Sequence, residues 1–205
     1  MKMGLPAKFL FASLLGTVPV RSEAAQEMAL TFGLKGGAGY SKTSQKTGSG
    51  ASVGGDKAKL GYLGGIGTDI SFGTLGLVTD FFYAQRSYSH ANNGGETVRQ
   101  VVVPALVRAD LVPIQVSFGA FVAAGVGKVK QTRLGVTVDR DYSGAALEKN
   151  DLGLAAGLGF KSPLGKNMVF TVEARALYGL TNTLSQPGSA SRKTRTLDVL
   201  AGFLL

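Results

Sequence analysis

Apolar and polar residues alternate with a period of two along much of the chain, most regularly over residues 150–181. Every second position is apolar over 152–160 and again over 170–180. In the second run, Glu173 and Arg175 fall between the apolar positions. Successive side chains of a strand point to opposite faces of the sheet, so the pattern predicts two strands joined by a short turn. A soluble sandwich would bury the apolar face, whereas a membrane barrel would turn it toward lipid and point Glu173 and Arg175 into the lumen.

Alternation of this kind marks eight segments. They cover about residues 28–42, 59–72, 75–88, 98–111, 114–126, 152–161, 170–180 and 197–205. The connections between them are alternately long and short, and the stretch over about 130–149 is expected to be one of the long loops. Barrels of the bacterial outer membrane combine short periplasmic turns with long external loops, and their tilted strands need about 9–11 residues to cross. The sequence therefore predicts an all-β fold, namely an eight-stranded antiparallel up-and-down transmembrane β-barrel.

Two residue types add detail to this barrel. Pro104 lies inside the fourth segment, where proline removes a donor from the strand ladder, so a bulge or a local break is expected there. Aromatic residues on the apolar rows are sorted, with phenylalanines near the short turns or termini and tyrosines near the long connections. Aromatic girdles at both interfaces are typical of barrels in a bilayer, and ordinary strand composition is the alternative explanation.

The N-terminus predicts export. Lys2 and Lys8 precede a mostly apolar run over residues 9–20, and small residues follow up to Ala25. This order is typical of a secretory signal peptide, and the apolar run is shorter than the roughly 20 residues of a membrane-anchoring helix. We therefore expect a signal peptide over 1–25, an outer-membrane β-barrel domain over 26–205, and a location in the bacterial outer membrane.

Composition and charge narrow the function classes. The chain has 30 glycines, no tryptophan and no cysteine, which excludes disulfides and thiolate metal sites. Its formal net charge is +9, and removal of three basic and one acidic residue with the signal peptide would leave +7. A basic balance suits nucleic acid or lipopolysaccharide phosphates, and export favours the second. No metal-ligand spacing or nucleotide-binding fingerprint occurs, so no cofactor, metal or nucleic-acid partner is expected.

Charged residues on the inward rows nearly cancel. They are Lys35, Asp69, Asp80, Arg86, Arg108, Asp110, Asp151, Lys161, Glu173, Arg175 and Asp198. Because charges shielded from water must be paired or hydrogen-bonded, we interpret these residues as a salt-bridge network. Four segments are rich in inward glycine and the other four carry bulky inward groups, so the bulky groups are expected to fill the lumen. Carboxylate catalysis and a narrow conduit are the alternatives, and pairing is favoured because basic partners are available.

Basic residues also gather near the long connections. Those selected as candidate contacts to lipopolysaccharide are Lys42, Lys130, Arg133, Arg192 and Lys193. Such groups can form charge-assisted hydrogen bonds to lipid phosphates. Simple solvation of a charged loop is the alternative reading.

Four stretches of the chain carry a family resemblance. KNDLGLAAGLGF, VEARALYGLTN, FFYAQRSYS and VVVPALVRADL resemble the PorT-like group of outer-membrane β-barrel domains, which is similar in architecture to OmpA and OmpX-type barrels. The resemblance implies an integral outer-membrane protein, often labelled porin-like, that is placed by the outer-membrane insertion machinery. Some members of the group are similar to accessory proteins of protein secretion. The resemblance transfers no catalytic residue.

Three functional hypotheses follow. The first is a closed barrel with a side-chain-filled lumen, which acts as a structural protein or binds a protein partner through its external loops. The second is a narrow porin-like channel for small solutes or an accessory barrel of a secretion system. The third, an enzyme acting on envelope lipid, is disfavoured because no nucleophile and base are positioned together.

Overall fold

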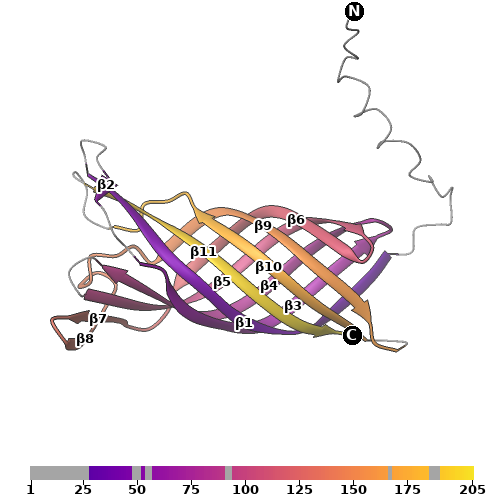
Figure 1. Ribbon diagram of the computed structural model, residues 1–205, viewed down its shortest axis with the longest axis horizontal. Helices are drawn as coiled ribbons and strands as arrows, with labels where there is room; N and C mark the ends of the chain where they lie inside the picture. The colour runs from indigo at the N-terminus through magenta and orange to yellow at the C-terminus, as the bar shows by residue number, and fades with distance from the viewer. Residues whose placement is uncertain (1–27, 48–51, 54–56, 91–93, 166–167, 185–189) are drawn as a thin grey trace, which may run out of the picture.

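In the computed structural model, the described part of the chain forms eight long strands and three short ones (Figure 1). The structure describes residues 28–47, 52–53, 57–90, 94–165, 168–184 and 190–205. The long strands are β1 (Met28–Thr47), β3 (Lys59–Phe72), β4 (Leu75–His90), β5 (Gly94–Leu111), β6 (Ile114–Gly125), β9 (Asn150–Pro163), β10 (Val169–Gly179) and β11 (Ala190–Leu204). The short strands are β2 (Ser52–Val53), β7 (Val129–Arg133) and β8 (Val136–Arg140).

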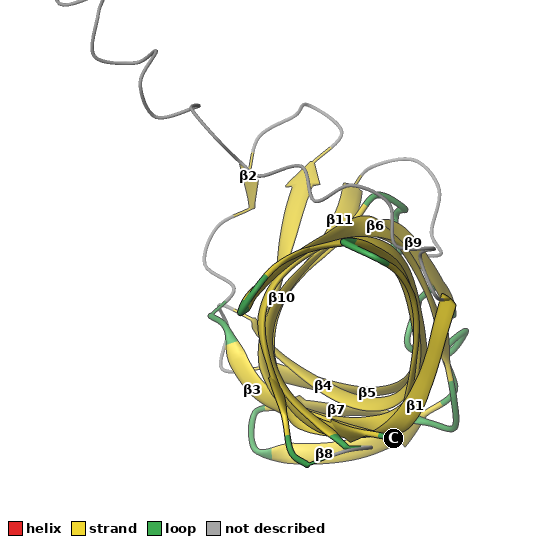
Figure 2. Ribbon diagram, turned by 90° about the vertical axis from the view of Figure 1, so that its right-hand side faces the viewer, coloured by secondary structure: helices red, strands yellow, loops and turns green. Residues whose placement is uncertain are grey.

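The long strands close into a ring (Figure 2). Each pairs antiparallel with the next along the chain, and β11 returns to pair with β1 from Gly33 opposite Leu204 to Thr47 opposite Ala190. Closure satisfies the backbone donors and acceptors that an open sheet would leave at its edges. The predicted eight-stranded antiparallel barrel is confirmed. The described part of the chain contains no helix that is long and apolar enough to cross a membrane.

The two faces of the wall differ as the alternation predicts. Apolar side chains of the outward rows are exposed, with Leu34 71% and Phe118 60% accessible, while the inward Asp198 is 1% accessible. Val172 is exposed on the same strand on which Arg175 is buried. A continuous apolar band of this extent is rare on soluble monomers, and it matches the lipid-facing surface of a membrane barrel. The alternative of a soluble sandwich with the apolar rows inside is therefore wrong.

The expected loop over 130–149 is partly wrong, because it contains a β-hairpin. Strands β7 and β8 pair with each other from Val129 opposite Arg140 to Arg133 opposite Val136, and β7 also pairs with β5. Leu134 and Gly135 join them with positive φ angles of 49° and 82°. Two such residues form the tight turn that suits a hairpin, although leucine rarely adopts this conformation.

Pro104 breaks the pairing between β4 and β5 locally without a bulge. Thr79 pairs with Ala105 and Phe82 with Val102, so the register is the same on both sides of the gap. On the other side of β5, Pro104 lies opposite Phe121 in an unbroken register with β6. The expected signal peptide over 1–25 lies outside the described residues.

Candidate functional site

The lumen contains charged side chains in layers between two ends, which we call the turn end and the loop end. The turn end carries the short connections 73–74, 112–113 and 164–168, and the loop end carries the long ones. Each layer combines side chains from strands that are far apart in the sequence. The layers are described below from the turn end upward.

The layer nearest the turn end is centred on Arg108 of β5. Its guanidinium forms an ion pair with Asp69 of β3, and its Nη2 donates to Asp110 Oδ2 over 2.8 Å. Lys161 of β9 reaches Asp69 Oδ2 at 3.3 Å, and Gln115 Nε2 donates to Asp110 Oδ1 over 2.9 Å. Two cations therefore share two carboxylates.

The middle layer is centred on Asp80 of β4, which is fully buried. Lys35 Nζ lies 2.8 Å from its Oδ1, and Arg175 Nη2 lies 2.7 Å from its Oδ2. Arg175 also donates to Glu173 over 2.9 and 2.8 Å, and its guanidinium lies 5.8 Å from the centre of the Phe82 ring. Arg175 is therefore held by two carboxylates and an aromatic face at once.

The next layer is a bidentate pair between Arg86 of β4 and Asp198 of β11. Both hydrogen bonds measure 3.1 Å, and Arg86 also donates to Ser41 Oγ over 3.3 Å. Ser41 is in turn 3.1 Å from the hydroxyl of Thr196. Two parallel N–H to carboxylate bonds are the strongest form of such a pair.

Asp151 differs from the other predicted network residues. Its carboxylate accepts hydrogen bonds from the Thr181 hydroxyl over 2.6 Å and from the Thr194 hydroxyl, and it has no ion pair within the described part of the chain. The other ten predicted residues all lie in ion pairs. The structure thus brings the predicted inward charges together, with hydroxyls in place of a cation at Asp151.

Glycine and apolar side chains account for the rest of the lumen. A Cβ at Gly67 would lie 2.7 Å from Asp80 Oδ1, and one at Gly157 would lie 2.5 Å from Glu173 Oε1, so these glycines leave room for the charged layers. Buried apolar side chains pack between the layers, including Phe82, Val102, Leu106, Phe121, Leu177 and Leu200. Two interior cavities measure only about 20 and 10 Å³, which is space for about one water molecule each.

Arg192 corrects one prediction. It was expected to contact lipopolysaccharide, but it is 5% accessible and forms a bidentate pair with Glu96 at 3.0 and 3.2 Å. The reason is that β11 begins at Ala190 and therefore includes Arg192. Arg192 lies an even number of residues before Asp198, so both side chains point into the lumen. Sequence reasoning missed Glu96 because it placed the start of the fourth segment at residue 98, whereas β5 begins at Gly94. Extending the alternation by four residues would have found it.

A cluster of buried apolar side chains, which we call the apolar cap, lies beside this pair at the loop end, where Tyr88 is opposite Glu96 in the register and its ring is 5.4 Å from the Arg192 guanidinium. It consists of Tyr88, Val98, Val129, Tyr142 and Leu147. The Tyr142 hydroxyl donates to the Arg99 carbonyl over 2.7 Å, and burial raises the pKa of Tyr142 to about 12. The cap joins the connection after β6 to the barrel wall.

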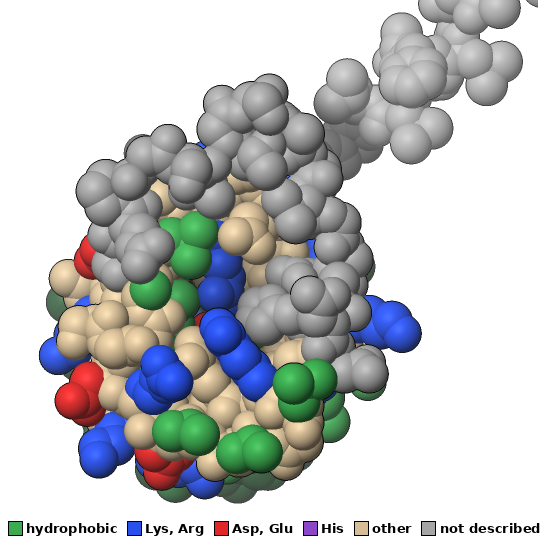
Figure 3. All heavy atoms as spheres, turned by 90° about the vertical axis from the view of Figure 1, so that its left-hand side faces the viewer, with side chains coloured by type: hydrophobic (Ala, Val, Ile, Leu, Met, Phe, Trp, Pro, Cys, Tyr) green, Lys and Arg blue, Asp and Glu red, His purple; other side chains and the backbone are tan. Residues whose placement is uncertain are grey.

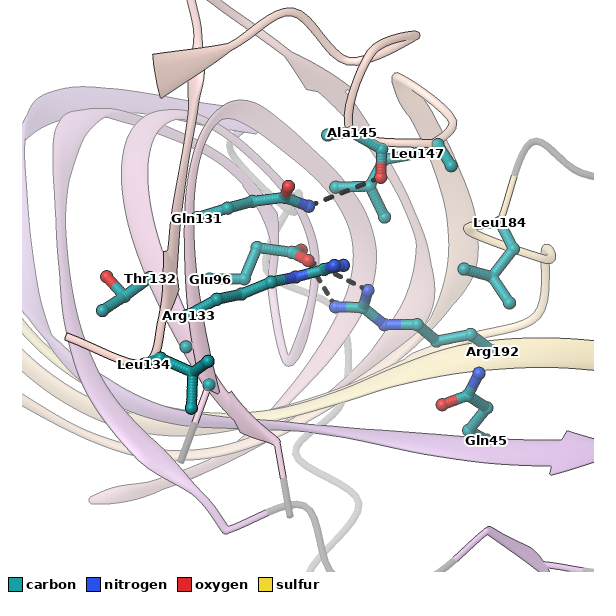
Figure 4. A pocket seen from close by; sticks show the side chains of 13 residues that line it. Gln45, Glu96, Gln131, Thr132, Arg133, Leu134, Ala145, Leu147, Leu184 and Arg192 are labelled. Atoms are coloured by element: carbon teal, nitrogen blue, oxygen red, sulfur yellow. Dashed lines mark hydrogen bonds and ion pairs between the residues drawn. The ribbon is translucent and has the colours of Figure 1, made fainter. Parts of the chain in front are cut away.

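A pocket of about 670 Å³ opens beside the cap (Figure 4). In that view the Arg192 and Glu96 side chains meet at its centre, and the Arg133 side chain extends toward them from the β7–β8 hairpin. Gln131, Leu147 and Leu184 line its sides. The pocket thus combines two guanidinium groups and one carboxylate with apolar and amide side chains.

The other four predicted lipopolysaccharide contacts lie at the loop end. Lys130 and Arg133 are exposed on β7, and Lys42 and Lys193 lie on the outer wall on β1 and β11. Viewed from the loop end, basic side chains are spread across the face that this end presents (Figure 3). The structure therefore divides these residues between the hairpin and the wall.

A family model for the outer membrane protein beta-barrel domain matches residues 24–185. The chain belongs to this family. It is therefore an outer-membrane β-barrel protein, and the loop end of such a barrel faces the cell exterior. No curated protein shows a significant match to the chain.

Several solved structures of outer-membrane proteins are similar to this family member. Ail, the attachment invasion locus protein of Yersinia pestis in complex with the heparin analogue sucrose octasulfate, is 18% identical, covering 86% of this chain and 99% of its own, with a TM-score of 0.43. OprG of Pseudomonas aeruginosa is 16% identical, covering 89% and 99%, with a TM-score of 0.45. Neisserial surface protein A is 12% identical, covering 87% and 98%, with a TM-score of 0.47.

Proposed function

We propose that this outer-membrane barrel is closed to solutes and acts through its external end, as a structural or binding protein of the cell surface. The observation that carries the proposal is the filled lumen, in which stacked ion pairs and apolar side chains pack around small interior cavities of about 20 and 10 Å³. An eight-stranded barrel is just wide enough for its own side chains.

The free-energy cost of separating buried ion pairs argues against a porin-like channel. A solute passing through the lumen would have to separate Asp80 from Arg175 and Arg86 from Asp198, all of which are buried. Breaking one buried pair costs about 3–5 kcal/mol, because it leaves uncompensated charges in a low-dielectric interior. Several such layers lie in series along the axis, so the ion pairs act as a plug.

The external end supplies the surface for interaction. It carries the pocket beside Arg192 and Glu96, the apolar cap with Tyr142, and exposed basic residues such as Lys130. Basic side chains at this level suit contact with lipopolysaccharide phosphates, and the pocket suits a protein or small acidic partner. A closer relation to the PorT-like group, and with it an accessory role in secretion, stays a prediction that rests on the sequence resemblance.

Solute efflux from vesicles tests the closed lumen. The refolded protein is inserted into vesicles loaded with a small neutral sugar, and efflux is compared with protein-free vesicles. We expect no added efflux from the wild type. Efflux is expected only when the central cation of the middle layer and the aromatic ring beside it are both removed, as in the double variant Arg175→Ala with Phe82→Ala. Efflux from the wild type at the rate of an open porin would contradict the proposal.

A further inference from the structure

A second basic site lies on the outside of the barrel wall, separate from the pocket at its mouth. A groove of about 250 Å³ runs between the loop-end parts of three strands, and we call it the wall groove. It is lined by Ser44 and Lys46 of β1, Tyr178 of β10, and Ser191, Lys193 and Arg195 of β11. Lys42 adjoins it, because this residue lies directly opposite Arg195 in the register of β1 and β11.

No carboxylate among the described residues neutralises the positive charge of the wall groove. Ser44 lies opposite Lys193 and Lys46 opposite Ser191, so four cations and two hydroxyls share the outward rows of two adjacent strands, and Lys42 directly faces Arg195. None of the ion pairs between described residues involves Lys42, Lys46, Lys193 or Arg195. Like charges directly opposite each other on paired strands destabilise a sheet. A bound anion with several oxygen atoms would remove this repulsion.

The level at which the wall groove lies in the membrane indicates which molecule supplies that anion. Toward the turn end, the same outer face continues with Tyr40 on β1 and with Leu197 and Val199 on β11, which are 58%, 52% and 54% accessible. Tyr178 lies at the boundary, and the Arg195 guanidinium lies 5.2 Å from the centre of its ring. Tyrosines mark the interface between hydrocarbon and headgroups in membrane barrels. The groove is therefore at headgroup depth, directly above a surface for acyl chains.

We propose that the wall groove binds the phosphate group of an outer-leaflet glycolipid, the lipid A part of lipopolysaccharide, whose acyl chains lie against Leu197 and Val199. Lysine and arginine would donate charge-assisted hydrogen bonds to the phosphate oxygens, and Ser44 and Ser191 would add neutral ones. This inference rests on the lipopolysaccharide contact in the proposed function and assigns it to one place. A free phosphate would use only the charges, whereas a lipid uses the charges and the wall below them.

The β7–β8 hairpin is a second basic region at the loop end, and its surroundings differ from those of the wall groove. Lys130, Arg133 and Arg140 are also exposed, but they lie on a hairpin that belongs to a long connection, and Asp139 and Asp141 flank Arg140. They lack an adjoining row of apolar residues on the barrel wall. A site built only from charge would make both regions equivalent, whereas a lipid site favours the wall groove.

Two matched variants test the assignment. The groove variant carries Lys42→Gln, Lys46→Gln, Lys193→Gln and Arg195→Gln, and the hairpin variant carries Lys128→Gln, Lys130→Gln, Arg133→Gln and Arg140→Gln. Each removes four positive charges from exposed or half-exposed positions. The full chain is refolded into nanodiscs of neutral phospholipid, and heat-modifiable gel mobility verifies the fold. Binding is measured by titration with lipopolysaccharide, with dephosphorylated lipopolysaccharide and with inorganic phosphate.

We expect lipopolysaccharide to bind the groove variant about tenfold or more weakly than the wild type, since each basic residue near an anionic headgroup adds attraction. The hairpin variant should bind within about threefold of the wild type, since its charges lie outside the site. A third variant, Lys42→Arg with Lys46→Arg and Lys193→Arg, keeps the charge and should retain binding, which shows that loss in the groove variant is not a folding defect.

The remaining outcomes separate the two proposals. If the hairpin variant loses binding and the groove variant keeps it, the wall groove is the wrong place while lipopolysaccharide contact stands. If the wild type binds intact and dephosphorylated lipopolysaccharide equally, both the groove assignment and the lipopolysaccharide contact fail. If inorganic phosphate binds the groove as tightly as lipopolysaccharide does, the site is an anion site without a lipid role, and the inference is overturned.

Discussion

Arg192 and Lys193 are neighbours in β11, yet their surroundings are opposite. Arg192 points inward, is 5% accessible and is held by Glu96, whereas Lys193 lines the outer wall groove without an ion pair to any described carboxylate. The same contrast holds along the described part of the barrel, where inward cations lie in ion pairs and outward cations near the loop end have no ion pair to a described carboxylate. Strand alternation thus separates charges that fill the lumen from charges that are available to a partner.

The largest expected effect comes from the middle layer. Arg175→Ala leaves Asp80 and Glu173 facing each other with only Lys35 to compensate them, and we expect it to lower the free energy of unfolding by about 3–5 kcal/mol. Urea unfolding of the protein in lipid vesicles, followed by heat-modifiable gel mobility, measures this. Lys193→Ala is the matched control and should change stability by less than about 0.5 kcal/mol. Equal losses in the two variants would remove the distinction between inner and outer cations.

The Arg192–Glu96 pair should come next. Arg192→Ala leaves the Glu96 carboxylate without its bidentate partner beside the cap, and we expect a loss of about 3 kcal/mol. The double variant Arg192→Leu with Glu96→Leu should recover much of that loss, because it removes both buried charges. The same unfolding assay measures both variants. If Arg192→Ala is as stable as the wild type, the pair is not the structural element described above.

Two adjacent glycines test packing inside and outside the wall. A Cβ at Gly65 would overlap the carbonyl oxygen of Phe81, whereas a Cβ at Gly64 would have its nearest neighbour, the Lys35 carbonyl oxygen, at 4.0 Å. Gly65→Ala should therefore destabilise the barrel by about 1–3 kcal/mol, as overpacking does. Gly64→Ala should be nearly neutral, and its unfolding midpoint provides the reference. A reversed order would show that the two faces have been assigned the wrong way round.

The smallest effect is expected at the cap, and it depends on pH. Because burial raises the pKa of Tyr142 from 10.0 to about 12, the folded state favours the neutral phenol. Its stabilisation is complete below pH 10 and is lost as the pH rises toward 12. Ultraviolet difference absorbance of tyrosinate should show late-titrating tyrosine, and Tyr142→Phe should reduce that late absorbance by one residue. Titration of that residue near its ordinary pKa would mean that the cap is open to water.

The barrel itself could be predicted from the sequence because its alternation is nearly unbroken. Parity alone placed Asp69, Asp80 and Arg175 on the inward face, and pairing followed from the cost of burying charges. The β7–β8 hairpin could not be predicted, because its Leu134–Gly135 turn lacks the Asn-Gly or Asp-Gly signal of such turns. Glu96 was missed because strand ends are the least certain part of a pattern.

Other features depend on register, which the sequence does not give. Lys42 and Arg195 are 153 positions apart and meet only because β11 closes onto β1 in this register. Similarly, Asp151 has threonine hydroxyls as partners because Thr181 and Thr194 are brought beside it from other parts of the chain. A sequence pattern fixes the face on which a residue lies, and closure of the ring decides which residue it meets.

Current recording across a planar bilayer tests the central claim most directly. The claim is that paired charges and apolar side chains fill the lumen of the barrel while its apolar outer surface faces the hydrocarbon of the membrane. With the refolded wild-type protein inserted, the account predicts a baseline without steady conductance, and channel openings only after Arg175→Ala is combined with Phe82→Ala. Steady channels in the wild type whose conductance changes with Arg108→Ala or Glu173→Ala would contradict it.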